Sequence, residues 1–233
     1  MDTAHRRELK HDKFVERVGH GVEYAAEHRS QVIKYGIAAL VALVVAAGAY
    51  WYINHQRDIR QAALRDAMAA FEAGVGQGGE FIRSFPTAEE KDKAVVKELG
   101  EVASKYSGKE EGKIARYFLG LHYADKGNLA EAEKNLKAVA DSGKGDYASQ
   151  AKFSLAHVYD ATGRQGEAEK LLRSLIDDPT VLVSKEQATI TLARLLAKNN
   201  PTEARKLLEP LRAERGPVSR AAITVLGEIP GAR

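Results

Sequence analysis

A duplication with a constant 36-residue offset is the feature that most restricts how this chain can fold. Segment 113–140 aligns with segment 149–176, and a repeat of this period is typical of stacked supersecondary units. In each copy a small residue and a Tyr precede a glycine, and an Ala and a Leu follow it four residues apart, which predicts two helices joined at the glycine. The matched pairs are Gly120 and Ala156, Tyr123 and Tyr159, Gly127 and Gly163, Ala132 and Ala168, and Leu136 and Leu172.

This pattern resembles the tetratricopeptide repeat. The second copy adds a closing Pro179, and a weaker third copy runs from 185 to 212. In the third copy Asn199-Asn200-Pro201 replaces the turn glycine, and we expect an Asn in the left-handed conformation followed by a helix that starts at Pro201. The matching residues are Leu119, Gly120, Tyr123, Gly127, Ala132 and Leu136 in the first copy, and Leu155, Ala156, Tyr159, Gly163, Ala168 and Leu172 in the second.

The predicted fold class is all-α: an N-terminal helix and a single transmembrane helix, followed by a tetratricopeptide-like solenoid of helical hairpins. The repeats occupy 113–217, and 218–233 holds a closing helix and the C-terminus. Residues 54–112 form an irregular opening hairpin, with a long insertion at 74–86 between its two helices. Atypical ends are expected of a solenoid, because its terminal units face water.

An uncharged run from Gly36 to Ile53 predicts a transmembrane helix over 35–53. Its 18 residues extend about 27 Å as a helix, close to the thickness of a bilayer's hydrocarbon core. Tyr50, Trp51 and Tyr52 follow at one end, as is typical of a membrane–water interface. Two alternatives are a buried core helix and a signal peptide cleaved at Ala47-Gly48-Ala49.

Small residues share one face of this predicted span. Ala38, Ala42, Ala46 and Ala49 are spaced four, four and three apart, which would let another helix approach closely. The preceding tail, 1–34, is predicted to be a cytoplasmic amphipathic helix, with Phe14, Val18, Val22 and Ala26 on one side. It either binds a membrane surface or partner, or is a marginal helix held by continuity with the span.

The charges beside the span favour neither orientation, since three basic residues lie within 20 residues of each end. The whole chain is nearly balanced, with 35 Lys and Arg against 32 Asp and Glu, so no nucleic-acid partner is expected. Cys is absent, which excludes disulfides and thiolate chemistry. The sequence contains no phosphate-binding loop, HExxH or GxSxG motif, so we expect no catalysis, cofactor, metal or small-molecule substrate, and a packed or groove-lining role for His122 and His157.

The order of tail, span and short repeat domain resembles the tetratricopeptide-like ancillary subunits of the SecYEG translocon in bacterial inner membranes. That resemblance implies a single-pass inner-membrane protein with a cytoplasmic N-terminus and a periplasmic repeat domain. Its implied partners are translocon subunits, periplasmic chaperones and emerging client segments. The chain would be a protein-interaction scaffold; the alternatives are an assembly factor or regulator that acts through tail and span, with the repeats as a spacer, and a membrane-tethered enzyme.

The resemblance also selects a partner-binding groove along the first helix of each repeat. Tyr117, Phe153 and Ile190 would form one row, and Leu121, His157 and Arg194 a second. The alternative is that Tyr117 and Phe153 pack between neighbouring repeats. The full set is Tyr117, Leu121, Asp125, Gln150, Phe153, His157, Ile190 and Arg194.

Overall fold

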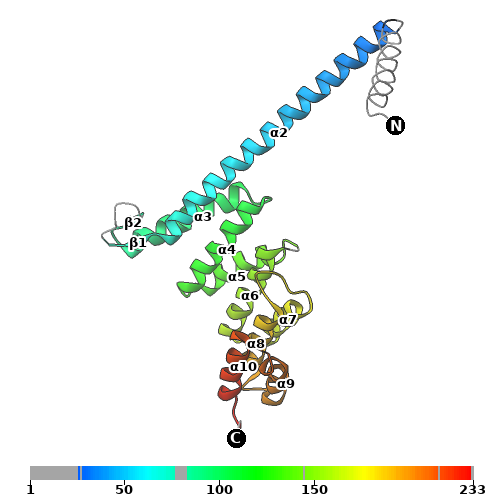
Figure 1. Ribbon diagram of the computed structural model, residues 1–233. Helices are drawn as coiled ribbons and strands as arrows, with labels where there is room; N and C mark the ends of the chain where they lie inside the picture. Colours follow the sequence, from blue (N-terminus) through cyan, green and yellow to red (C-terminus); the bar gives the residue numbers. More distant parts are fainter. Residues whose placement is uncertain (1–25, 27, 77–82, 144, 215, 232–233) are drawn as a thin grey trace, which may run out of the picture. The chain divides into compact units, whose positions relative to one another are not determined.

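The computed structural model of the chain describes residues 26, 28–76, 83–143, 145–214 and 216–231. The chain divides into two units, Met1–Asp58 and Ile59–Arg233, and helix α2 (Arg29–Glu72) runs through the boundary. The elements that follow α2 are β1 (Gly74–Val75), β2 (Ser84–Phe85), α3 (Ala88–Lys105), α4 (Glu110–Asp125), α5 (Leu129–Ala140), α6 (Asp146–Ala161), α7 (Gln165–Asp177), α8 (Lys185–Leu196), α9 (Pro201–Arg212) and α10 (Pro217–Glu228) (Figure 1).

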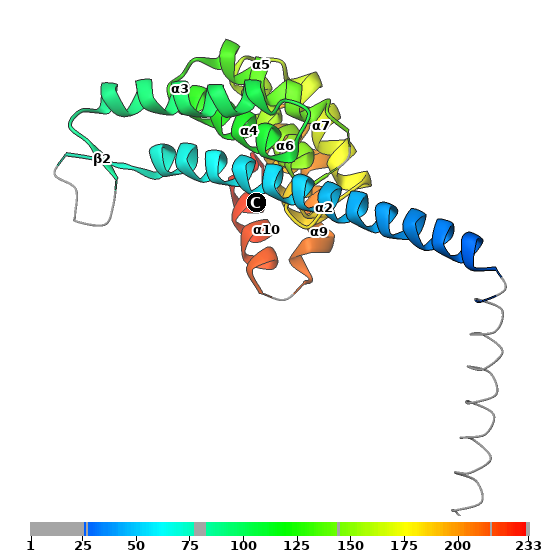
Figure 2. The same ribbon diagram turned by 90° about the horizontal axis from the view of Figure 1, so that it is seen from above.

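The helices of the second unit stack in chain order. From α3 to α10 each helix packs against the next, and α4 also contacts α6, as α8 contacts α10 (Figure 2). Helices α4 and α5, α6 and α7, and α8 and α9 therefore form three hairpins, and α10 follows the last of them. This arrangement is a tetratricopeptide-like helical solenoid, which confirms the predicted fold class.

Glycine makes the turn in the first two hairpins. Gly127 and Gly163 have φ of 72° and 76°, a left-handed conformation that only glycine adopts readily. The third turn differs from our expectation, because no described residue other than glycine has a positive φ. The Asn200 side chain instead accepts a hydrogen bond from the Glu203 N–H at 3.3 Å and caps α9, with Pro201 in the first turn.

Small residues permit close crossing of the two helices in a hairpin. A Cβ placed on Gly120 of α4 would lie 2.8 Å from Cγ of Leu136 in α5. Ala156 and Leu172 occupy the equivalent positions of α6 and α7 and are 2% and 1% exposed. A second close approach lies at the start of α4, where a Cβ on Gly112 would overlap the carbonyl oxygen of Tyr106.

Most of the core of the second unit lies in two clusters of buried side chains, and a small third cluster of Leu175, Val183 and Ala188 lies under the α7–α8 loop. The larger of the two main clusters runs through the hairpins and includes Leu136, Leu172 and Leu208. The other joins the end of α2 to α3 and α4 through Ala70, Leu99 and other apolar residues. The second cluster holds the opening hairpin against the first repeat.

The connection between α2 and α3 contains the strands that the all-α prediction lacked. β1 and β2 pair in parallel over two residues each, with Gly74 opposite Ser84 and Val75 opposite Phe85. Lys91 of α3 donates a hydrogen bond to the carbonyl oxygen of Ala73 at 2.6 Å, which fixes the end of α2 to α3.

In the first unit the described residues are mainly those of α2. Large apolar side chains between Val32 and Ile53 are 43–75% exposed, and Trp51 stacks on His55 at 5.2 Å between ring centroids. The amphipathic tail predicted for 1–34 lies largely outside the described residues.

The crossing geometry predicts opposite effects for two glycine substitutions. Gly120→Leu should lower the free energy of unfolding by about 1–3 kcal/mol, because the added side chain overlaps Leu136. Gly100→Ala in α3 is the matched control: nothing lies within 4 Å of its Cβ position, so it should raise stability by about 0.5–1 kcal/mol. Denaturant unfolding of the full chain in a mild detergent measures both, and equal stability of wild type and Gly120→Leu would contradict the proposed crossing.

Candidate partner-binding site

An apolar hollow lies between the first two hairpins. We call it the α4–α6 hollow; its volume is about 300 Å³, and α4, α5 and α6 all line it. Its floor includes Leu136, the fully buried residue that packs on Gly120. Three of its nine lining residues are polar. The lining residues are Leu121, Ala124, Asp125, Leu129, Leu136, Ser154, His157, Val158 and Ala161.

The same hollow recurs one repeat further along, in a smaller form. The α6–α8 hollow has a volume of about 70 Å³ and lies between α6, α7 and α8. His157 takes the place of Leu121 and Arg194 the place of His157, so longer polar side chains occupy equivalent positions. The lining residues are Ala156, His157, Asp160, Leu172, Thr191, Arg194 and Leu195.

Four of the predicted site residues line these hollows. Leu121, Asp125 and His157 meet in the first, and His157 and Arg194 in the second, so His157 belongs to both. Their contact with a partner stays a prediction.

Tyr117 lies in the core rather than on an open surface. Its side chain is 7% exposed, and its ring meets Phe118 and Tyr147 edge-on, at 5.2 and 5.6 Å between centroids. Burial raises the pKa of its phenol. Tyr117 therefore packs between neighbouring repeats, which was the alternative to the predicted groove-lining role.

Gln150 links three parts of the solenoid. Its Oε1 accepts a hydrogen bond from the Tyr117 hydroxyl at 3.2 Å, and its Nε2 donates to the carbonyl oxygen of Leu182 at 3.1 Å. The amide is thus used to attach the α7–α8 loop to α6 and α4.

Phe153 and Ile190 are half-buried against the core. Phe153 packs near Val183, and its ring meets the imidazole of His157 edge-on at 5.0 Å. Of the first predicted row, only Tyr117 is buried, whereas the second row of Leu121, His157 and Arg194 lines the hollows. Contact of Phe153 and Ile190 with a partner stays a prediction.

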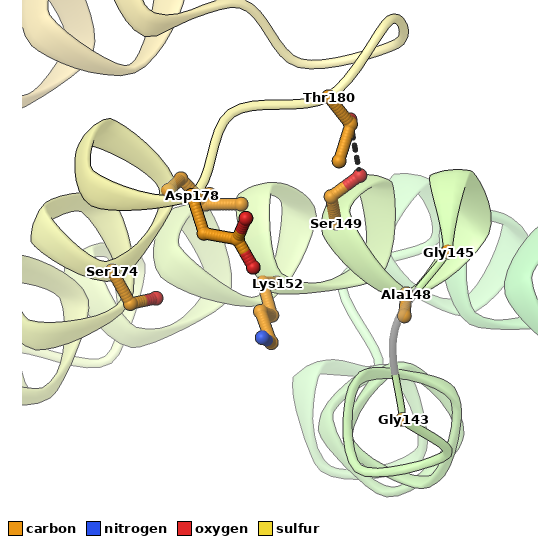
Figure 3. A pocket seen from close by; sticks show the side chains of 9 residues that line it. Gly143, Gly145, Ala148, Ser149, Lys152, Ser174, Asp178 and Thr180 are labelled. Atoms are coloured by element: carbon orange, nitrogen blue, oxygen red, sulfur yellow. Dashed lines mark hydrogen bonds between the residues drawn. The ribbon is translucent and has the colours of Figure 1, made fainter.

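A third hollow, of about 120 Å³, lies where the α7–α8 loop meets the start of α6 (Figure 3). The hydroxyls of Ser149 and Thr180 form a hydrogen bond of 2.7 Å across it, and the Val183 N–H donates to Thr180 Oγ1 at 3.2 Å. These hydrogen bonds hold the α7–α8 loop against the start of α6. The hydroxyls that line this hollow therefore have a structural role.

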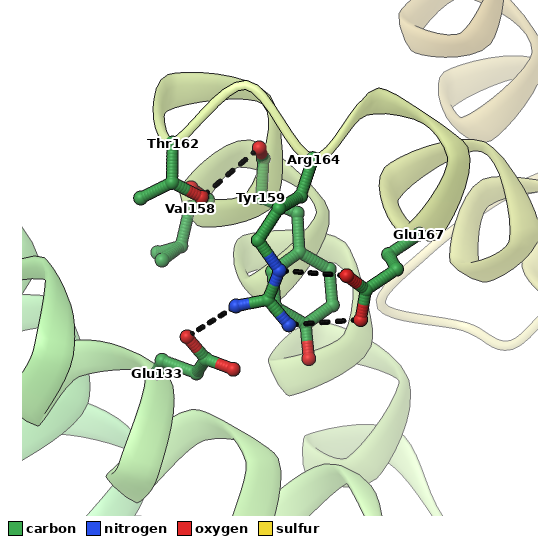
Figure 4. Close-up of polar contacts among 6 residues, drawn as sticks. All are labelled: Glu133, Val158, Tyr159, Thr162, Arg164 and Glu167. Carbon is green, nitrogen blue, oxygen red and sulfur yellow. Dashed lines mark hydrogen bonds and ion pairs between the residues drawn. The ribbon is translucent and has the colours of Figure 1, made fainter.

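Charged clamps connect the second helices of successive hairpins. The guanidinium of Arg164 lies over the Tyr159 ring at 4.0 Å and donates to Glu167 at 2.7 and 2.8 Å and to Glu133 of α5 at 2.6 Å (Figure 4). The hydrogen bond to Glu167 and, to a smaller extent, the one to Glu133 raise the pKa of Arg164. Arg173 of α7 joins Glu203 of α9 in a similar way. Neither clamp is recognisable in the sequence, because residues about 30 positions apart share no local pattern.

His122 is buried between α3 and α4. Its Nε2 lies 3.7 Å from Oδ1 of Asp92. The other carboxylate oxygen of Asp92 forms an ion pair with Lys126 Nζ at 2.7 Å. Burial lowers the pKa of the imidazole, and Asp92 opposes the shift in part. Partial burial also lowers the pKa of His157. Within the described part of the chain, no group of three or more His, Asp or Glu residues is placed to hold a metal ion.

The hairpins, their small crossing residues and the recurring hollows define a tetratricopeptide-like class of protein. A family model described as a tetratricopeptide repeat-like domain matches residues 31–178, well over half of the chain, and the chain belongs to this family. Repeats of this kind generally mediate protein–protein interaction and are typically non-enzymatic.

Solved structures support the fold. The chain is similar to the nearly identical TPR-like repeats of a protein described as a kinesin light chain of Podosopora anserina, at 18% identity and a TM-score of 0.52. A single-substitution variant of that protein gives a TM-score of 0.53, and both comparisons cover 76% of this chain and 86% of the other. No curated protein sequence matches this chain.

The lowered pKa of His122 predicts an acid-sensitive fold. Between that lowered value and about 6.5, the unfolded chain binds more protons than the folded chain, so stability falls as the pH decreases through this window. Below the folded-state pKa the loss levels off. His122→Gln should reduce this loss, measured as the difference in the free energy of unfolding between about pH 7.5 and pH 5. An undiminished loss in the variant would show that other groups cause the acid sensitivity.

Proposed function

We propose that this protein is a membrane-anchored scaffold that binds an extended polypeptide segment in the two hollows of its repeat domain. The observation that carries the proposal is the recurrence of a hollow with an apolar floor between successive hairpins, lined by equivalent positions of α4, α6 and α8. A repeated, preformed surface suits an extended chain, which presents side chains at regular intervals.

The long apolar part of α2 supports the membrane anchor. This helix is long and apolar enough to cross a membrane, and none of its most apolar 18-residue window is buried. A buried core helix would pack these side chains against other elements. Tyr50, Trp51 and Tyr52 at the end of the run suit a membrane interface.

More specifically, the protein would be an ancillary subunit of the SecYEG translocon in a bacterial inner membrane. Its N-terminus would be cytoplasmic and its repeat domain periplasmic, where translocon subunits, chaperones or emerging client segments would be its partners. Support for this assignment comes from the order of span and repeats along the chain, which resembles that family.

One feature favours a second candidate, an assembly factor that acts through its tail and span. Ala38, Ala42, Ala46 and Ala49 are all exposed on α2 and would accept a second transmembrane helix at close range. In that case the repeats would act as a spacer and the hollows would bind no segment.

Protease accessibility tests the topology. In spheroplasts, added protease should remove the repeat domain and leave the N-terminal tail intact, because only the domain after Ile53 lies outside the cytoplasm. Digestion of the tail together with protection of the repeat domain would show the opposite orientation. A mature chain that begins at Tyr50 would identify a cleaved signal peptide.

Filling the α4–α6 hollow tests the scaffold function. A photo-crosslinker placed at Ala161, an exposed residue of the same hollow, should capture protein partners in intact membranes, and Leu121→Trp should reduce the capture about tenfold by occupying the hollow. Ile223→Trp is the matched control, because Ile223 is 53% exposed on α10 and lines neither hollow. Unchanged capture by Leu121→Trp, with a wild-type thermal midpoint, would favour the spacer role instead.

A further inference from the structure

The two hollows each contain an acidic side chain that forms no hydrogen bond or ion pair within the described structure. Each carboxylate acts electrostatically on one imidazole, Asp125 on His122 and Asp160 on His157. Asp125 lines the α4–α6 hollow and Asp160 the α6–α8 hollow, and both are exposed. Neither carboxylate accepts a hydrogen bond or forms an ion pair with any other residue that the structure describes. Free carboxylates in two successive repeats give the surface a defined charge preference.

Nearby acidic groups are used differently. Asp92 pairs with Lys126 at 2.7 Å, Glu133 with Arg164 at 2.6 Å, and Glu228 with Arg194 at 3.7 Å. In the part of the chain that is described, the carboxylates of Asp125 and Asp160 thus remain available to a ligand, whereas these neighbours already have cationic partners.

The cations close to the hollows already have other partners. Lys91 and Lys126 line a neighbouring hollow with Asp125, but Lys91 donates to the carbonyl oxygen of Ala73 and Lys126 pairs with Asp92. Arg194 is the one Lys or Arg that lines either hollow among the described residues, and it lies beside Glu228. Lys198 is equivalent in the repeat to Asp125 but lines neither hollow. His157, shared by both hollows, has a lowered pKa, so its imidazole is largely neutral at pH 7.

We infer that the hollows select an extended segment in which an apolar side chain is flanked by Lys or Arg, in preference to an acidic segment. The apolar side chain would contact Leu121, Ala124 and Leu129, which are partly exposed in the α4–α6 hollow, and the basic side chains would reach Asp125 and Asp160. This inference rests on the proposed scaffold function and adds the chemistry of the ligand.

The repeat also sets the spacing of the basic residues. Helices α4 and α6 are in contact, which places their axes about 8–10 Å apart, and Asp125 and Asp160 lie near the ends of these helices, one position out of register in the repeat. An extended chain advances about 3.3 Å per residue, which places the two basic residues about three positions apart.

A matched pair of labelled peptides tests the charge preference. Both are capped 12-residue peptides with two Leu residues; one carries two Lys residues three positions apart, and the other carries Glu at those positions. Fluorescence anisotropy with the full chain in an uncharged detergent should show at least about fivefold tighter binding of the Lys peptide, decreasing with added salt.

The protein variants locate the effect. Asp125→Asn combined with Asp160→Asn should weaken binding of the Lys peptide by about 3- to 10-fold. Glu101→Gln combined with Glu214→Gln removes the same charge from exposed positions outside the hollows and should leave binding unchanged.

Three results would overturn the inference: equal or tighter binding of the Glu peptide, equal weakening by the control pair, or no binding of either peptide. Failure of the scaffold function is a separate result, because it appears as unchanged partner capture by Leu121→Trp. Loss of capture in that variant together with equal affinity for both peptides would keep the scaffold and reject its charge preference.

Discussion

The close contact between the two helices of each hairpin is the interaction on which the solenoid and its candidate site both depend. Gly120 lets Leu136 approach α4 so closely that a Cβ would meet it at 2.8 Å, and Leu136 then forms part of the floor of the α4–α6 hollow. Ala156 and Leu172 do the same in the next repeat, where the extra methyl group accompanies a smaller hollow. The residue type at the crossing therefore affects core packing and the candidate binding surface together.

The 36-residue repeat explains why so much of the fold was predictable from the sequence. The turns at Gly127 and Gly163 and the lining residues Leu121, His157 and Arg194 all follow from positions that recur about every 36 residues. Tyr117 obeys the same period but is buried against the rings of Phe118 and Tyr147, and Gln150 connects its hydroxyl to the α7–α8 loop. That loop has no counterpart in the repeat pattern, so the sequence period carried no information about it.

Long-range polar contacts were the part that the sequence did not predict. Arg164 selects Glu133 from among 32 acidic residues in the chain, and only the folded arrangement brings these two side chains together. The parallel pairing of β1 with β2 is similar, since two-residue strands contain too little pattern to recognise. The predicted left-handed turn at Asn200 was wrong for a different reason. Asn supports both a left-handed turn and an N-cap, and Pro201 favours the cap.

The charged residues of the repeats therefore have two separate uses. On the second helices, the clamps of Arg164 and Arg173 link successive hairpins and help to fix their relative positions. On the first helices, Asp125 and Asp160 remain unpaired within the described structure, beside hollows whose walls the clamped hairpins provide. A surface that is already ordered before binding loses little conformational entropy of its own, so the ordering cost falls mainly on the segment. An extended partner can then bind through a few apolar and charged contacts, which is the mode expected of a scaffold with modest sequence demands.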